Sequence, residues 1–434
     1  MNFLKPISIS LSPNTEKDDV RTAFKLLFQP WLWIAGDSPQ QGEEDKSSSS
    51  PFAAARELEE VFKNYLGAGH AVSFNSGRSA AMAIFSSLDL EKGDEVLLQS
   101  FTCNAAVNPI VWAGLKPVYV DCDEKTFNID IEDLKKKITP QTKAVMVQHT
   151  FGKPAEMDDI LKICQQYNLI LIEDCAHSLG ASYHGKKVGT FGKAAFFSFS
   201  RDKVISSVYG GMALTDDPEL GKRIREYQEK AGFPSYFWVK QQLLHPVLMN
   251  WLILPTYRFP GKYFLILFQW LHILSKAVHW KEKRAKRPGY FPKRLPNALA
   301  VLALKQFGKL ERFNNHRRGV AEFYIKELSN SKYLIPDAEY YKDSIFLRFS
   351  VKHPKAREII RQAWRKNLLI GDWYTIPIAP YDTKLEKVHY LLGCCPEAED
   401  LSRETLNLPT HINISEKEAK IIVDFLKSCD ESKD

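Results

Sequence analysis

Residues 172–203 read IEDCAHSLGASYHGKKVGTFGKAAFFSFSRDK, and this stretch decides the fold. An apolar strand, LILIED, ends at Asp174, and a second one, AAFFSFS, ends shortly before Lys203, which stands 29 positions after Asp174. In open α/β sheets, ligands bind beyond the carboxyl ends of the strands. The stretch therefore predicts that one carboxylate and one amine face the same ligand site.

This pairing suits pyridoxal phosphate (PLP). A lysine amine forms a Schiff base with the aldehyde of that cofactor, and a carboxylate at the pyridine nitrogen keeps the ring protonated as an electron sink. Taken singly, a lysine after a strand is usually a solvated loop charge, and an aspartate at a strand end is usually a cap or turn residue. The neighbouring motifs decide between these interpretations.

Between residues 70 and 215, short apolar runs alternate with helix-like segments, which is typical of a parallel α/β sheet. Helical periodicity lies between the runs. The predicted strands are 70–74, 94–99, 116–121, 143–149, 169–174, 194–200 and 210–216, and the predicted helices are 79–88, 105–114, 131–138 and 157–168.

The segment FNSGRSAAMAIF, residues 74–85, passes from a strand into a helix through Ser76, Gly77 and Arg78. Such a turn aims free backbone N–H groups and the positive end of the helix dipole at an anion, so it suits the cofactor phosphate. By itself it could equally be an ordinary capped helix start. Likewise, the hydroxyl of Ser198 could bind a ligand or satisfy the local backbone.

The composition indicates a globular chain of 434 residues, 44% of them hydrophobic, with two domains or one large domain and an appendage. Seven cysteines without CxxC spacing predict reduced thiols in a cytoplasmic protein and no metal site. The first residues lack the apolar core of a secretion signal. A net charge of +7 is too modest at this size to indicate a nucleic-acid partner.

Collinear motifs over some 350 residues resemble the DegT/StrS-type PLP-dependent sugar aminotransferases, which belong to the fold-type-I aspartate aminotransferase superfamily. The resemblance implies an α/β fold with a mostly parallel central sheet, helices on both faces and a smaller C-terminal α+β domain. The segments that carry it are NSGRSA, GDEVLLQSFTCNAAVNPIVWAGLKPVYVDCDEKTFNID, VQHTFGKPAEMDDI, residues 172–212 and CPEAEDLSRETLNLPTHINISEKEAKIIVDFL.

Carried over by position, the resemblance implies that Asp174 meets the pyridine nitrogen and that Lys203 binds the cofactor and then moves the substrate proton. It places His177 near the ring hydroxyl, although a core histidine is the plainer alternative. The aromatic residue that usually stacks on the ring follows the Thr of an FT motif, where this chain has Cys103, with Phe101 two residues earlier. The implied phosphate ligands are Ser76, Gly77, Arg78 and Ser198.

The resemblance further implies a homodimer, with a basic or amide side chain of each subunit near the cofactor of the other. Arg294 is the candidate by position, or simply one member of a basic run. Where the family commonly has GEGG after the lysine, this chain has VYGG, with Tyr209 in the second position. We expect that difference to change the donor or acceptor pocket.

The implied reaction moves an amino group from glutamate or glutamine to a keto sugar, in this family typically one linked to a nucleotide, in surface polysaccharide or glycoconjugate synthesis. Relatives that act as sugar dehydratases replace the lysine by histidine, so Lys203 favours aminotransfer, and a PLP-dependent dehydratase is the alternative. A non-catalytic regulator on the same fold is less well supported, because Asp174 and Lys203 are both retained.

Residues 232–288 form an apparent insertion, and this is the clearest departure from the family pattern. Its apolar runs, 245–257 and 263–274, are each too short to span a bilayer. Tryptophans and flanking cations suit peripheral contact with an anionic membrane through 243–280. A helical hairpin buried against the main domain or a dimer mate is the alternative. The expected segments are an N-terminal segment with a Ser-rich loop at 38–51 (1–50), the large PLP-binding domain (51–231), the insertion (232–288), a connecting helix (289–314) and a small C-terminal domain (315–434).

Overall fold

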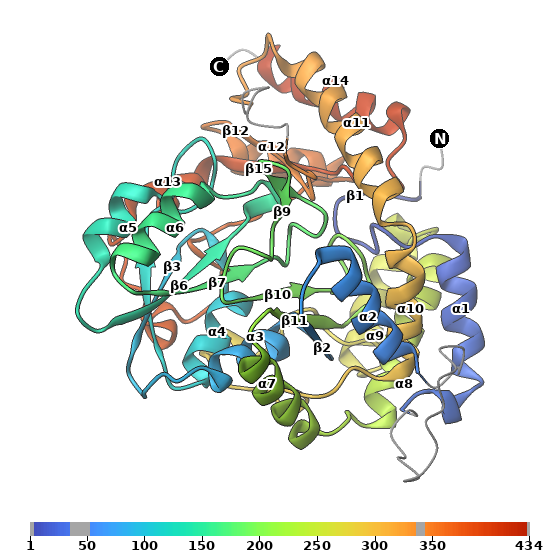
Figure 1. The fold of residues 1–434 in the computed structure, drawn as a ribbon. Coiled ribbons are helices and arrows are strands. Elements are labelled where there is room, and N and C mark those ends of the chain that lie inside the picture. Colours follow the sequence, from blue (N-terminus) through green and yellow to red (C-terminus); the bar gives the residue numbers. More distant parts are fainter. Residues whose placement is uncertain (1–3, 35–52, 336–342, 432–434) are drawn as a thin grey trace.

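The computed structural model describes residues 4–34, 53–335 and 343–431, and Figure 1 shows the chain as a ribbon. The predicted Ser-rich loop at 38–51 lies outside these residues. All seven cysteines are free thiols, as expected.

A seven-stranded sheet forms the centre of the molecule, and its strands are the seven that the sequence predicts. Strand β11 runs antiparallel to both of its neighbours, and the other pairs in the sheet are parallel. The prediction of a mostly parallel sheet is therefore confirmed. In spatial order the strands are β2 (His70–Phe74), β11 (Gly211–Thr215), β10 (Ala194–Ser198), β7 (Ile170–Asp174), β6 (Thr142–Gln148), β3 (Glu95–Gln99) and β5 (Lys116–Val120).

Helices cover both faces of this sheet, because alternate strand residues point to opposite sides. Leu97 and Val145 pack in one core with α5 and α6, whereas Leu98 and Met146 pack in another with α3 and α4. Figure 1 shows α7 beside α3 and, across the sheet, α2 beside α10. These helices are α2 (Ala54–Leu66), α3 (Gly77–Ser87), α4 (Asn104–Trp112), α5 (Ile131–Lys137), α6 (Met157–Gln166), α7 (Pro218–Ala231) and α10 (Asn297–Phe307).

A smaller C-terminal unit has its own apolar core and contains both helices and strands. Strand β1 (Ile7–Ser8) joins it by pairing with β13 (Leu368–Leu369), so an N-terminal strand is part of this unit. The short strand β14 (Ile378–Ala379) pairs with β4 (Thr102–Cys103) of the large domain. Other elements are α1 (Lys17–Leu27), β8 (Ser182–Tyr183), β9 (Lys186–Lys187), α11 (Leu310–Leu328), β12 (Phe349–Lys352), α12 (Ala356–Arg365), α13 (Pro396–Glu404), β15 (Thr405–Leu408) and α14 (Glu416–Glu431).

The insertion folds as two helices, α8 (Tyr236–Leu248) and α9 (Lys262–Trp270), joined by irregular π-helical turns. Helix α8 packs against α1 and α10, while none of the α9 residues is fully buried. A short segment, residues 275–282, then leads back to the large domain, and we call it the return segment. Among the described residues, no helix combines the length and the apolar character needed to cross a membrane.

Candidate active site

A cavity of about 310 Å³ lies at the carboxyl ends of β7 and β10, where the sequence places the ligand site. The elements around it come from the N-terminal segment, the large domain, the insertion and the C-terminal unit. Seven of the predicted site residues line it, namely Gly77, Arg78, Cys103, Asp174, His177, Ser198 and Lys203.

Asp174 is the last residue of β7 and is buried, and its Oδ1 accepts a hydrogen bond from the Ala176 N–H at 3.0 Å. Burial raises the pKa of this carboxyl to about 6, against the opposing effects of that hydrogen bond and of the Lys203 charge. The carboxylate thus lacks a full counter-charge from the protein. A protonated ring nitrogen in the cavity would supply one.

Lys203 lies in the loop between β10 and β11, with its Nζ 5.0 Å from the centre of the Trp373 ring. Burial lowers the pKa of this amine, which increases the neutral fraction needed for nucleophilic attack and for proton transfer. Asn14 Nδ2 donates a hydrogen bond to the carbonyl of Lys203, and the buried guanidinium of Arg317 donates to the Val204 carbonyl at 2.8 Å. The loop is therefore held from outside the large domain's sheet.

His177 lies between two aromatic rings, parallel to Phe151 at 5.9 Å and to Trp373 at 5.5 Å. Its Nδ1 accepts a hydrogen bond from the Phe151 N–H at 3.3 Å, and its Nε2 is 3.5 Å from the Tyr374 hydroxyl. Burial and the Lys203 charge hold the pKa of His177 well below its usual value. The ring is thus neutral and carries its proton on Nε2, as a donor toward Tyr374 or a ligand.

The first turn of α3 forms a cradle for an anion. Ser76 caps the helix, with its Oγ accepting from the Ser79 N–H at 3.0 Å, and Gly77 follows. A Cβ on Gly77 would lie 2.8 Å from the Cβ of Ser198, so only glycine permits this approach to the end of β10. The N–H groups of a first helical turn lack intrahelical acceptors, and the helix dipole favours an anion there.

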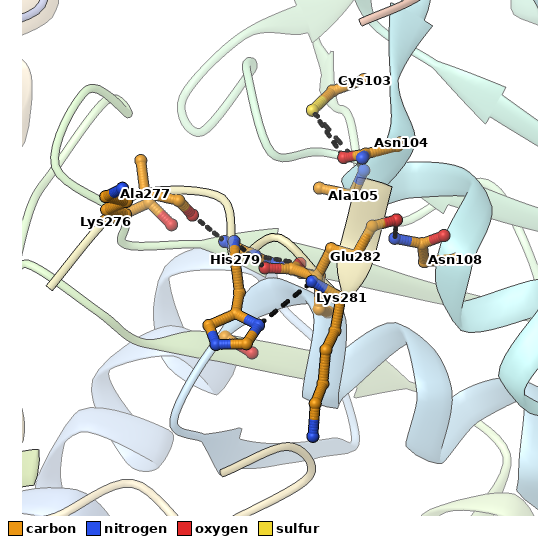
Figure 2. A network of polar contacts seen from close by, with 12 residues as sticks. Cys103, Asn104, Ala105, Asn108, Lys276, Ala277, His279, Lys281 and Glu282 are labelled. Atoms are coloured by element: carbon orange, nitrogen blue, oxygen red, sulfur yellow. Dashed lines mark hydrogen bonds and ion pairs between the residues drawn. The ribbon is translucent and has the colours of Figure 1, made fainter. Parts of the chain in front are cut away.

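The Arg78 side chain is already engaged by the insertion. Its guanidinium forms an ion pair with Glu282, both side chains being buried, and its Nη2 donates to the Ala277 carbonyl at 3.1 Å. The Glu282 carbonyl accepts from Asn108 Nδ2 at 3.0 Å, and Figure 2 shows the return segment lying against α4 at this contact. The Arg78 side chain is therefore taken up by the return segment, and its backbone N–H would be the group left to contact a phosphate.

Three predicted residues lie away from the cavity lining. Ser76 serves as the cap described above. Phe101 is fully buried and packs against Phe127 at 5.7 Å and Tyr374 at 5.3 Å, so it supports the site from behind. The backbone of Arg294 forms an antiparallel β-bridge with Phe74 at the edge of the sheet, and its guanidinium carbon lies 4.6 Å from the Phe233 ring centre.

Several lining residues were not predicted, and many of them come from distant parts of the chain. Trp373 and Tyr374 carry no recognisable local motif. Tyr209 is the exception, because its place in VYGG marks it as unusual. Its hydroxyl donates to the Lys276 carbonyl at 2.7 Å and so holds the return segment in place. The others include Ser12, Thr102, Gln148, Arg201, His245, Met249, Leu265 and Gln269.

The residues present fit PLP. Asp174 would hold the ring nitrogen, Lys203 the aldehyde carbon, and the α3 turn with Ser198 the phosphate. When bound, PLP supplies an electron sink that makes a proton on the adjacent substrate carbon removable. These residues would thus match both charged groups of the cofactor, the protonated ring nitrogen and the phosphate.

The chain matches the sequence profile described as the DegT/DnrJ/EryC1/StrS aminotransferase family over residues 44–245 and 268–427. Residues 246–267, which include the turns after α8 and the start of α9, fall between the two matched parts. The residues that would hold the cofactor thus lie in the matched part of the chain, whereas the lining residues Met249 and Leu265 do not.

Two curated relatives show how the similarity is distributed. The chain is 41% identical to a GDP-perosamine synthase of Caulobacter vibrioides over 169 residues. This matched segment covers 39% of the chain and only 46% of that relative. It is 28% identical over 373 residues to a UDP-N-acetyl-3-dehydro-alpha-D-glucosamine 3-aminotransferase of Acidithiobacillus ferrooxidans, covering 86% of the chain and 87% of that enzyme. The strong identity is therefore local, and the weaker one spans nearly both proteins.

Among solved structures, an aminotransferase of Helicobacter pylori involved in the biosynthesis of pseudoaminic acid superimposes with a TM-score of 0.74, at 22% identity, over 99% of this chain and 100% of that one. This likeness shows the fold. The profile match over most of the chain establishes that the protein belongs to the DegT/DnrJ/EryC1/StrS aminotransferase family, whose cofactor is PLP.

Proposed function

We propose that this enzyme transfers an amino group from glutamate or glutamine to the keto group of a sugar linked to a nucleotide or another phosphate-bearing carrier. The observation that carries the proposal is the placement of Lys203 and Asp174 on one cavity at the strand ends, in a member of an aminotransferase family. Lys203 would take the proton from the donor carbon and return one to the acceptor side.

The other cavity residues serve this proton transfer. Asp174 is buried, so its charge acts at low dielectric on the ring nitrogen. His177 is neutral and fixed between two rings, so it can donate one hydrogen bond without adding charge near Lys203. Retention of Lys203 supports transfer over dehydration.

The test is the visible spectrum of the protein with added PLP, for the wild type and for Lys203→Ala, before and after glutamate. We expect a band at about 410 to 430 nm in the wild type, absent in the variant and bleached by glutamate. A wild-type band that ignores glutamate while water is lost from a keto sugar would favour the dehydratase. A spectrum that does not depend on Lys203 would contradict the proposal.

A homodimer is part of the proposal. Arg294 lies outside the cavity of its own chain, as a residue serving a partner's site must. Light scattering should give a mass near twice 49.7 kDa. The variant Arg294→Ala should keep that mass and bind PLP more weakly, and a monomeric wild type with full activity would contradict this assignment.

We also propose peripheral contact with an anionic membrane through one side of α9. Tyr263, Ile266 and Trp270 recur at helical spacing and are exposed, with Ile266 at 63% and Trp270 at 74%. Between Tyr236 and Lys281 the sequence contains no acidic residue, and the exposed cations Arg258, Lys262 and Lys276 flank the helix. Apolar side chains beside cations suit the interface of an anionic bilayer.

Co-sedimentation with vesicles of phosphatidylglycerol and phosphatidylcholine tests this contact. The double variant Ile266→Ser with Trp270→Ser should lose binding, while Leu391→Ser with Leu392→Ser, equally exposed but in the C-terminal unit, should keep it. Light scattering on the same variants shows whether α9 instead joins two subunits. No binding by the wild type, or a changed mass in the first variant, would overturn the membrane assignment.

A further inference from the structure

Arg201 and His245 both line the cavity, from different elements, and have no part in the chemistry described above. Arg201 follows β10, two residues before Lys203, and His245 belongs to α8 in the insertion. His245 is only 5% exposed. The site therefore contains a cation and an imidazole that the cofactor residues do not explain.

Both side chains have a nitrogen without a partner. In the described parts of the chain, His245 Nδ1 and Arg201 Nε are buried and have no hydrogen-bond acceptor or donor opposite them. The remaining contacts are to neutral groups, since His245 Nε2 lies 3.4 Å from Ser12 Oγ and Arg201 Nη2 donates to Ser275 Oγ at 2.5 Å. Polar groups buried in this way cost free energy until a ligand satisfies them.

Among the residues that the structure describes, the charge of Arg201 also lacks a direct ion pair, although the carboxylate of the adjacent Asp202 attracts it through space. No carboxylate within the described ranges forms an ion pair with it, although the neighbouring Arg78 is neutralised by Glu282. Its guanidinium carbon lies 5.5 Å from the centre of the Tyr209 ring, which itself holds the return segment. A guanidinium that is held in a cavity without an ion-pair partner is suited to bind an anion. The planar arrangement of its N–H donors matches the oxygens of a phosphate.

The surroundings strengthen such binding. Met249, Leu265 and Val278 line the cavity near the insertion and are apolar. Water is poorly accommodated among them, and charge-assisted hydrogen bonds are stronger at low dielectric. Burial and the Arg201 charge keep the pKa of His245 well below its usual value, so its ring is neutral. With the Ser12 hydroxyl donating to Nε2, the Nδ1–H is free to donate to an oxygen.

We propose that Arg201 and His245 form a binding site for a phosphate group of the acceptor substrate, the carrier phosphate next to the keto sugar. This rests on the proposed aminotransfer to a phosphate-linked sugar and adds the residues that recognise its carrier. The cofactor phosphate is the other source of the same chemistry, but the α3 turn with Gly77 and Ser198 already provides a cradle for it.

Calorimetric titration of the PLP-loaded enzyme with inorganic pyrophosphate tests the site, because the cofactor then occupies its own cradle. We expect one saturable site in the wild type, weakened about 10- to 100-fold by Arg201→Ala, as for a lost charge-assisted contact. Arg201→Lys should restore part of the affinity, and His245→Phe should weaken binding less than Arg201→Ala. Arg223→Ala removes an exposed arginine on α7 and should change nothing.

A second titration, of PLP into the cofactor-free protein, distinguishes the two sources of phosphate. The proposal expects Arg201→Ala to keep wild-type PLP affinity. Loss of PLP affinity with no pyrophosphate site in the loaded wild type would assign Arg201 to the cofactor and overturn the proposal, as would unchanged pyrophosphate binding in Arg201→Ala. A failure of the aminotransferase assignment itself would show separately, in the Lys203→Ala spectrum.

Discussion

The two walls of the cavity are built on different principles. One wall consists of strand ends and the α3 turn, and it contributes the titratable groups Asp174 and Lys203. The other consists of α8, α9 and the return segment, and it contributes mainly apolar side chains with His245. The family profile matches the first wall and is interrupted at 246–267 in the second. We therefore expect the residues at the sheet to carry out the reaction and those of the insertion to contact the acceptor.

The Arg78–Glu282 ion pair joins the two walls, and breaking it should have the largest effect. Glu282→Ala leaves a buried guanidinium unpaired, which we expect to lower the free energy of unfolding by about 3 to 5 kcal/mol. Urea unfolding measures the loss. The control Glu60→Ala removes the exposed Lys63–Glu60 pair and should cost under about 1 kcal/mol. Equal losses in the two variants would mean that the return segment does not depend on this pair.

Asp174, in the first wall, should destabilise the cofactor-free protein when its carboxyl is ionised. Its native pKa of about 6 exceeds the usual value near 4, so the native state holds this proton to higher pH than the unfolded chain does. The contribution of Asp174 to the free energy of unfolding is therefore greatest below about pH 4. It falls by up to about 3 kcal/mol as the pH rises to about 6. Without PLP, Asp174→Asn should be more stable than the wild type at pH 8.

Urea unfolding of both cofactor-free proteins at a series of pH values checks the sign. The advantage of Asp174→Asn should shrink toward pH 4 and stay constant above pH 7, while its PLP affinity is reduced at every pH. An advantage that grows with acidity would show that Asp174 is stabilised as an anion in the empty site.

The α3 cradle allows a sharper test of the first wall. In Gly77→Ala the new Cβ would lie 2.8 Å from the Ser198 Cβ, an overlap that should weaken PLP binding about tenfold. PLP titration by absorbance measures it. Ser198→Gly in the same chain should recover part of the loss, and Gly319→Ala, with open space around its Cβ, should bind PLP normally. Normal PLP binding by Gly77→Ala would show that the α3 turn does not hold the cofactor phosphate.

The smallest effect concerns the second wall alone. Leu265→Ala removes apolar contact on the acceptor side, and we expect the acceptor KM to rise about fivefold, worth about 1 kcal/mol. The donor half-reaction, followed as bleaching by glutamate, should proceed at the wild-type rate. A slower donor step would mean that the two walls do not divide the work as proposed.

Residues tied to local sequence signals could be predicted. Asp174 and Lys203 follow apolar strands, and Gly77 follows a strand and opens a helix, so each position is determined by its own neighbours. Phe101 was considered only through the family resemblance, and it lies behind Tyr374, because the pairing of β4 with the distant β14 sets what covers it. The ion pair taken up by Arg78 could not be foreseen either, since Glu282 is 204 positions away.

By itself, the sequence determined the seven strands, the shared cofactor chemistry and the existence of an unusual apolar insertion. Periodicity and strand-end residues are local properties, and a short segment suffices to express them. Only the tertiary structure decided that the insertion lines one side of the cavity, that Tyr209 and Arg78 hold its return segment, and that His245 and Arg201 line the same cavity. Those contacts join residues far apart in the chain, so packing alone selects them.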